Sequence, residues 1–157
     1  MRRKDREVTD RADILGIIDA CEVVSLALVD GEWPYVVELN FGYADEDGKL
    51  SLYFHGANEG KKLDLIKRNS NAAFAMSCDH LYVPGSTGCS ATYRFSSVCG
   101  RGKISIVQGP EKQKALTALM AHYERDKVYE FEERHAAPTC VLKLEIESLA
   151  GKRKAVQ

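Results

Sequence analysis

The sequence predicts a mainly β protein, a β-barrel with flanking helices, and two observations support this prediction. About six segments are rich in Val, Leu, Tyr and Phe, several with the two-residue alternation of a strand, and short turns such as Asp30-Gly31 join some of them. Only two or three segments have the spacing of an amphipathic helix. Strands joined by tight turns pair antiparallel, and closing such a sheet removes its exposed edges. We therefore expect a six-stranded antiparallel barrel, in a single domain spanning residues 1–157.

The expected elements follow one another with short connections. The expected strands are residues 22–29, 34–43, 49–55, 72–78, 92–108 and 139–147. The expected helices are residues 10–21, 58–69 and 110–123. Asp10 and Asn58 are the expected N-caps of the first two helices. Residues 79–91 are expected to form a loop of low order, and Gly100 with Gly102 predicts a bulge in the strand that follows.

The charge balance and the absence of apolar segments exclude several classes of protein. The chain has 22 Lys and Arg against 23 Asp and Glu, so no overall basic field attracts nucleic acid or an anionic membrane. No stretch approaches the ~20 apolar residues of a membrane span, and residues 1–7 do not begin a signal peptide. We expect a cytoplasmic protein. Its five cysteines are odd in number and lack a CxxC pair, so we expect reduced thiols, mostly in the core.

Residues 52–66 carry the clearest functional pattern. A strand ends, Gly56 allows a sharp turn, and a helix begins close to Gly60, Lys61 and Lys62. A helix N-terminus presents unpaired N–H groups and a partial positive charge, which together suit a phosphate. Two lysines in the first turn oppose the helix dipole, and a bound anion would explain them. The alternative is that both are solvated surface lysines.

His55 ends the strand beside this turn and shares a face with Tyr53. A histidine ring can stack on or hydrogen-bond to a bound ring system, and it titrates near neutrality, which suits proton transfer. The alternative is a strand histidine that bonds to the backbone.

Two other expected strands carry polar groups with binding potential. Asn40 offers both a donor and an acceptor, which fits the edge of a flavin pyrimidine. Arg94 can pair with a phosphate as a bidentate donor. The alternatives are an exposed polar sheet face for Asn40 and a solvated or ion-paired side chain for Arg94.

These segments resemble the pyridoxamine 5'-phosphate oxidase-related FMN-binding split-barrel family, in particular its nitroimidazole-resistance (Nim-type) branch. The similar blocks include residues 39–43, 52–55, 60–62, 78–80 and 93–102. Their order and spacing extend over essentially the whole chain.

The resemblance implies an FMN-binding split barrel that works as a homodimer, with FMN at the subunit interface. The predicted cofactor-binding residues, from pattern and resemblance together, are Asn40, Phe41, Gly42, Tyr53, His55, Lys61, Lys62, Arg94, Ser96 and Ser97. In the resemblance, Lys61 and Lys62 match the phosphate-binding turn, and residues 40–42 match the strand beside the isoalloxazine ring. Ser96 and Ser97 match positions near the cofactor.

Three functional hypotheses remain open. The first is a nitroreductase-like FMN-dependent oxidoreductase that passes electrons from NAD(P)H to a small electron-poor acceptor such as a nitroaromatic, with His55 as the catalytic residue. The second is a non-enzymatic flavin or heme carrier, with His55 as an axial ligand. The third is a zinc site at Cys78, His80 and Cys89, which the ligand spacing disfavours, so no metal ligand is predicted.

Overall fold

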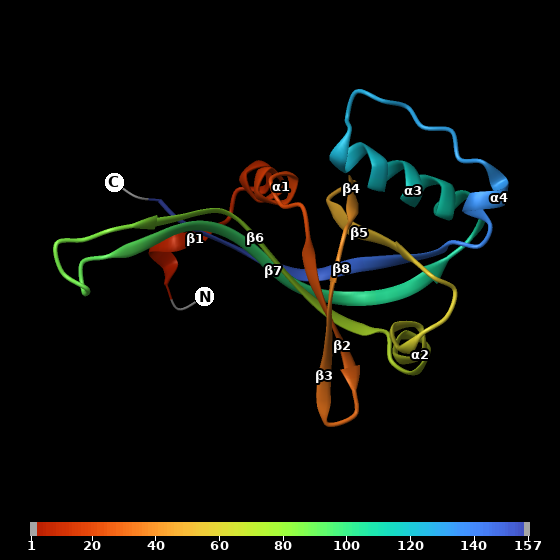
Figure 1. Cartoon of the computed structure of the whole chain (residues 1–157), viewed down its shortest axis with the longest axis horizontal. Helices are drawn as coiled ribbons and strands as arrows, with labels where there is room; N and C mark the ends of the chain where they lie inside the picture. The colour runs from red at the N-terminus through yellow and green to blue at the C-terminus, as the bar shows by residue number, and fades with distance from the viewer. Residues whose placement is uncertain (1–2, 156–157) are drawn as a thin grey trace.

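The fold is an antiparallel sheet flanked by helices, seen in a computed structural model that describes residues 3–155 (Figure 1). The strands are β1 (Glu7–Val8), β2 (Val24–Asp30), β3 (Trp33–Leu39), β4 (Gly42–Glu46), β5 (Lys49–Gly56), β6 (Asn71–Val83), β7 (Thr92–Val107) and β8 (Cys140–Lys154). The helices are the 3-10 helix η1 (Lys4–Arg6) and α1 (Arg11–Asp19), α2 (Lys61–Arg68), α3 (Gly109–Tyr123) and α4 (Glu133–Ala136). The mainly β class with flanking helices is thereby confirmed.

The sheet has eight strands in the described residues rather than the expected six, in the order β3-β2-β6-β7-β8-β5-β4, with β1 paired to β8. The short β1 was not expected. The other added strand arises because the expected strand 34–43 breaks at Asn40 and Phe41 into β3 and β4. These two strands follow each other in sequence yet lie at opposite ends of the sheet path. The sheet therefore curls round without pairing its two ends, which makes it a split barrel.

Two groups of apolar side chains pack on the two faces of β5. Leu50, Leu52 and Phe54 point into the main core, as the alternation predicts. Tyr53 points to the other face, where α3 covers it, so it is fully buried as well. The exposed side chains of β5 are those of Lys49 at its start and His55 near its end.

The first helix confirms its predicted start. The Asp10 carboxylate accepts a hydrogen bond from the Asp13 N–H at 3.0 Å. Ile14, Ile17 and Ile18 form the buried face of α1.

Three local expectations were wrong. Asn58 does not cap α2: the N-cap is Gly60, with φ +122°, and the Asn58 amide instead donates to the Pro138 carbonyl. Residues 79–83 are strand rather than loop, because β6 and β7 continue pairing past a bulge between Cys78 and Leu81. The resulting β6–β7 hairpin extends well beyond the rest of the sheet (Figure 1). The last strand also continues beyond the expected 139–147, because residues 148–154 pair with β7.

The predicted bulge is confirmed. The register shift in β7 falls between Arg101 and Gly102, where a bulge was predicted. A Cβ on Gly102 would lie 1.8 Å from the Glu145 carbonyl oxygen, so glycine is needed there. No helix in the described range is both long and apolar enough to cross a membrane. Cys21, Cys78 and Cys140 are buried, and Cys89 and Cys99 are exposed; all five are unbridged.

Candidate functional site

The predicted phosphate-binding turn lies where β5 ends and α2 begins. Residues 57–60 connect the two elements, and Gly60 takes a positive φ that other residues rarely adopt. Lys61 and Lys62 are the first two residues of α2, as predicted, so both lie beside the positive end of the helix dipole. The two lysines nevertheless have different environments.

Lys61 is paired within the protein. Its Nζ lies 2.6 Å from Asp30 Oδ2 and 5.3 Å from the centre of the Tyr35 ring. Asp30 was interpreted from the sequence only as a turn residue, and nothing in its local pattern indicates this ion pair. These contacts attach the first turn of α2 to the β2–β3 hairpin, so Lys61 already has a structural role.

No carboxylate within residues 3–155 pairs with the Lys62 ammonium. Its side chain is partly buried and turns toward the end of β5, where a Cβ on Gly56 would lie 3.2 Å from the Lys62 Nζ. Burial lowers the pKa of Lys62 below its usual value. Among residues 3–155, Nζ makes no ion pair and no hydrogen bond. A desolvated ammonium at a helix N-terminus is an unfavourable arrangement that an anion would neutralise. Of the predicted pair, Lys62 is therefore the better phosphate ligand.

His55 lies one residue before Gly56, on the opposite face of β5. It borders a pocket of about 380 Å³ between the end of β5, α3 and the segment leading into α4. Leu116, Leu119 and Phe131 line the interior of this pocket. An exposed imidazole beside an apolar cavity can orient a ligand or exchange a proton with it.

Four other predicted residues gather beneath α3 rather than beside the turn. Phe41 is fully buried and its ring centre is 4.4 Å from that of His122. A Cβ on Gly42 would lie 2.4 Å from the α3 backbone. The Asn40 amide donates to the Tyr123 hydroxyl at 3.3 Å.

The fourth of these residues, Tyr53, contacts α3 directly. Its hydroxyl donates to Glu111 Oε1 at 3.0 Å, and burial raises the pKa of Tyr53 to about 12. The structure therefore gives Asn40, Phe41, Gly42 and Tyr53 a role in holding α3. Their predicted cofactor contacts remain predictions.

The three predicted residues of β7 lie apart from the turn. Ser96 is buried, and Arg94 is exposed at the base of the β6–β7 hairpin. Ser97 lines a shallow pocket of about 420 Å³ together with Ser77 and Glu38. The structure does not bring these residues together with Lys62 within one chain.

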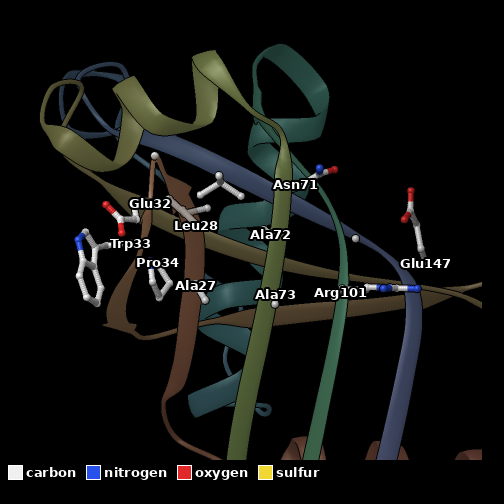
Figure 2. A pocket seen from close by; sticks show the side chains of 13 residues that line it. Ala27, Leu28, Glu32, Trp33, Pro34, Asn71, Ala72, Ala73, Arg101 and Glu147 are labelled. Carbon is white, nitrogen blue, oxygen red and sulfur yellow. The ribbon is translucent and has the colours of Figure 1, made fainter.

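Within residues 3–155, no helix covers one face of the sheet, which is formed by β3, β2, β6 and β7. A pocket of about 520 Å³ lies on it, with Ala27 and Ala73 at its base. Figure 2 shows Trp33 on one side of these alanines and Arg101 and Glu147 on the other. Trp33 is 73% exposed, and sequence reasoning missed it, although a lone tryptophan beside a turn is a usable signal.

The zinc hypothesis gains no support. Within residues 3–155, no three His, Cys, Asp or Glu side chains are grouped closely enough to hold a metal ion. His80 Nε2 is instead 3.0 Å from the Ser77 hydroxyl.

The fold places this protein in the class of split-barrel proteins. Comparison with known proteins identifies its family. The sequence profile of the pyridoxamine 5'-phosphate oxidase family matches residues 10–153. This chain belongs to the pyridoxamine 5'-phosphate oxidase-like family, which confirms the resemblance seen in the sequence. No curated protein matches the sequence.

Solved structures of several proteins share the fold. A candidate 5-nitroimidazole antibiotic resistance protein from Bacteroides thetaiotaomicron is 30% identical, with a TM-score of 0.80 over 94% of this chain and 86% of its own. The FAD and heme binding protein from Mycobacterium smegmatis is 19% identical, with a TM-score of 0.81 over 96% of this chain and 74% of its own. The flavocytochrome Anf3 from Azotobacter vinelandii is 17% identical, with a TM-score of 0.79 over 99% and 72%.

Proposed function

We propose that this protein binds FMN and acts as an oxidoreductase that passes electrons from NAD(P)H to a small electron-poor acceptor such as a nitroaromatic. The observation that carries the proposal is Lys62, a partly buried ammonium without a partner in residues 3–155, at the N-terminus of α2. A phosphate there would receive hydrogen bonds from Lys62 and from the free N–H groups of the first turn. The family and the similarity to a candidate nitroimidazole resistance protein agree with this assignment.

The chain's own residues would supply binding and proton transfer. FMN, when bound, supplies the redox chemistry. Lys62 holds the phosphate, and Asp30 keeps Lys61 and the start of α2 in place. A ring nitrogen of His55 holds a proton beside the pocket in which an acceptor would lie.

We further propose that two copies of the chain associate through the helix-free face of the sheet, with the flavin held between them. Small side chains such as Ala27, Ala73 and Ala75 allow close approach, and Trp33 and Val36 are 73% and 56% exposed. Large exposed apolar groups are typical of protein–protein contacts. A partner would also bring a second Ser97 and Arg94 into reach of the flavin, which one chain alone does not.

Titration of the flavin-free protein with FMN, followed by quenching of flavin fluorescence, tests the proposal. We expect Lys62→Ala to weaken FMN binding by at least about tenfold, because a charge-assisted contact to phosphate is lost. Lys62→Arg should retain most of the affinity. Riboflavin, which lacks the phosphate, should bind wild type and Lys62→Ala equally.

Lys67→Ala is the matched control, since Lys67 lies in the last turn of the same helix and is exposed. Equal FMN affinity of wild type and Lys62→Ala would contradict the phosphate site. Failure of the wild type to take up FMN would contradict the proposed cofactor. NADPH and NADH oxidation in the presence of nitrofurazone then tests the oxidoreductase.

A non-enzymatic flavin or heme carrier is the second candidate. Two structural neighbours are described as an FAD and heme binding protein and a flavocytochrome, and the exposed His55 side chain is accessible to a heme as an axial ligand. A Soret band after addition of hemin, lost in His55→Ala, would favour this function over the reductase.

A further inference from the structure

The pocket beside His55 contains features that the phosphate site does not use. It lies on the α3 side of β5, whereas Lys62 lies near Gly56 on the other side of the strand. Its interior is apolar, with Leu116, Leu119 and Phe131 among the lining residues. A volume of about 380 Å³ is at the small end of the range for ligand pockets, which suits a molecule of one or two rings.

The polar groups at the edge of this pocket are imidazoles, carboxylates and the Thr139 hydroxyl, which donates to the His135 carbonyl at 2.9 Å. His55 and His135 lie there with Glu130 and Glu132. Glu132 is already neutralised, because its Oε2 accepts a hydrogen bond from Arg134 Nε at 2.6 Å.

Glu130 has no ion pair or hydrogen bond within the described part of the chain, so it is the carboxylate available to a ligand. Every residue that lines the pocket belongs to this described part, and none of them is Lys or Arg. An anion would therefore meet no Lys or Arg side chain among the lining residues and would be repelled by Glu130. A ligand with a positive charge would pair with Glu130 while its ring fills the apolar interior.

We propose that this pocket binds a small aromatic cation, a one- or two-ring molecule bearing an amidine, amine or similar N–H-rich group. Binding itself does not require flavin. The assignment of such a molecule as the acceptor of the reaction rests on the proposed function, with His55 positioned to contact its ring.

The test uses benzamidine, benzyl alcohol and benzoate, which share a benzene ring and differ in charge. Each is titrated into the flavin-free protein, and the imidazole resonances of His55 and His135 are followed by NMR. We expect saturable shifts with benzamidine and at least about tenfold weaker binding of benzoate. Glu130→Gln should weaken benzamidine binding roughly three- to tenfold and leave benzyl alcohol binding unchanged, as expected for the loss of one exposed charge pair.

Glu133→Gln is the matched control, because Glu133 is a neighbouring exposed glutamate that does not line this pocket. Equal binding of benzamidine and benzoate, or equal effects of the two glutamine variants, would overturn the proposal. FMN uptake is measured on the same proteins: wild type that binds benzamidine but not FMN refutes the proposed function and leaves this pocket standing. Wild type that binds FMN but shows no saturable benzamidine shift refutes the pocket alone.

Discussion

At the scale of single residues, the position of α3 depends on the absence of a side chain at Gly42. A Cβ on Gly42 would lie 2.4 Å from the carbonyl carbon of Ala118 and from the N of Leu119, a distance that no adjustment of a side chain relieves. Gly42 has an ordinary negative φ, so the requirement is for space and not for backbone freedom. The close approach of β4 and α3 therefore rests on this one glycine.

We expect Gly42→Ala to lower the free energy of unfolding by about 1–3 kcal/mol, the usual cost of overpacking. Gly16→Ala is the matched control, because a Cβ on Gly16 meets nothing within 4 Å and lies on the exposed side of α1. It should stabilise the protein by about 0.5–1 kcal/mol, since alanine favours helix. Urea unfolding followed by circular dichroism measures both changes. Equal stabilities of wild type and Gly42→Ala would mean that α3 shifts freely.

The sequence could predict where the two lysines lie but not how they differ. Their place after Gly60 indicates the first turn of a helix, and this proved correct. The ion pair between Lys61 and Asp30 joins residues far apart in sequence, so no local pattern reveals it. The packing of α2 against the β2–β3 hairpin gives Lys61 an acidic partner and gives Lys62 none within residues 3–155.

At the scale of elements, hydrogen bonds at the C-terminal end of α3 attach this helix to two other segments of the chain. The Tyr123 hydroxyl donates to the Glu22 carbonyl at 2.6 Å and accepts from the Phe41 N–H at 3.1 Å. Beside it, His122 Nε2 donates to the Cys21 carbonyl at 2.8 Å. These bonds tie α3 to the segment before β2 and to the break between β3 and β4.

Removing the hydroxyl with Tyr123→Phe should destabilise the fold by about 1–3 kcal/mol, because the Phe41 N–H loses its acceptor in a partly buried place. Native-state hydrogen exchange should show the Phe41 amide losing protection while the β6–β7 amides keep theirs. Tyr129→Phe is the control, since the Tyr129 hydroxyl has no hydrogen bond in the described residues. Unchanged exchange at Phe41 would contradict the role given to Tyr123.

Local patterns predicted the elements well where the apolar period was regular. They failed where tertiary contacts determine where a strand breaks or ends. The first and third helices and three of the expected strands (22–29, 49–55 and 92–108) lie close to their expected places. The strands expected to begin at residues 72 and 139 begin there within one residue but extend further than expected. The break at Asn40 and Phe41 was missed because residues 34–43 alternate without interruption, and only the contact with α3 bends the chain there. Residues 79–83 were missed because pairing with β7, and not their own sequence, extends β6.

At the scale of the whole molecule, no part of residues 3–155 covers the helix-free face of the sheet. Ala75 lies near its middle, between Ser25 on β2 and Cys99 on β7. Strands β2 and β6 here show a row of small side chains to the outside. Among the residues predicted for cofactor binding, Lys61 and Lys62 begin α2, whereas Arg94, Ser96 and Ser97 lie on β7. We propose that a second copy of the chain brings these two groups together.

We expect sedimentation velocity to show a dimer for wild type and a monomer for Ala75→Arg, because a buried unpaired charge opposes association. Ala121→Arg is the control, since Ala121 is exposed on α3, away from this face. Both variants must retain the wild-type melting temperature for the comparison to hold. A monomeric wild type, or a dimeric Ala75→Arg of native stability, would contradict the proposed interface.

The placement of β8 has a consequence for the order in which the sheet assembles during synthesis. This strand, the last of the described elements to be translated, pairs with β7 on one side and β5 on the other, and its far end also receives β1. Until it emerges, β4 and β5 pair with no other strand of the sheet, and the edges of β5 and β7 that pair with β8 stay uncovered. We therefore expect a ribosome-bound chain to carry two partial sheets, which residues 140–154 join once they are released.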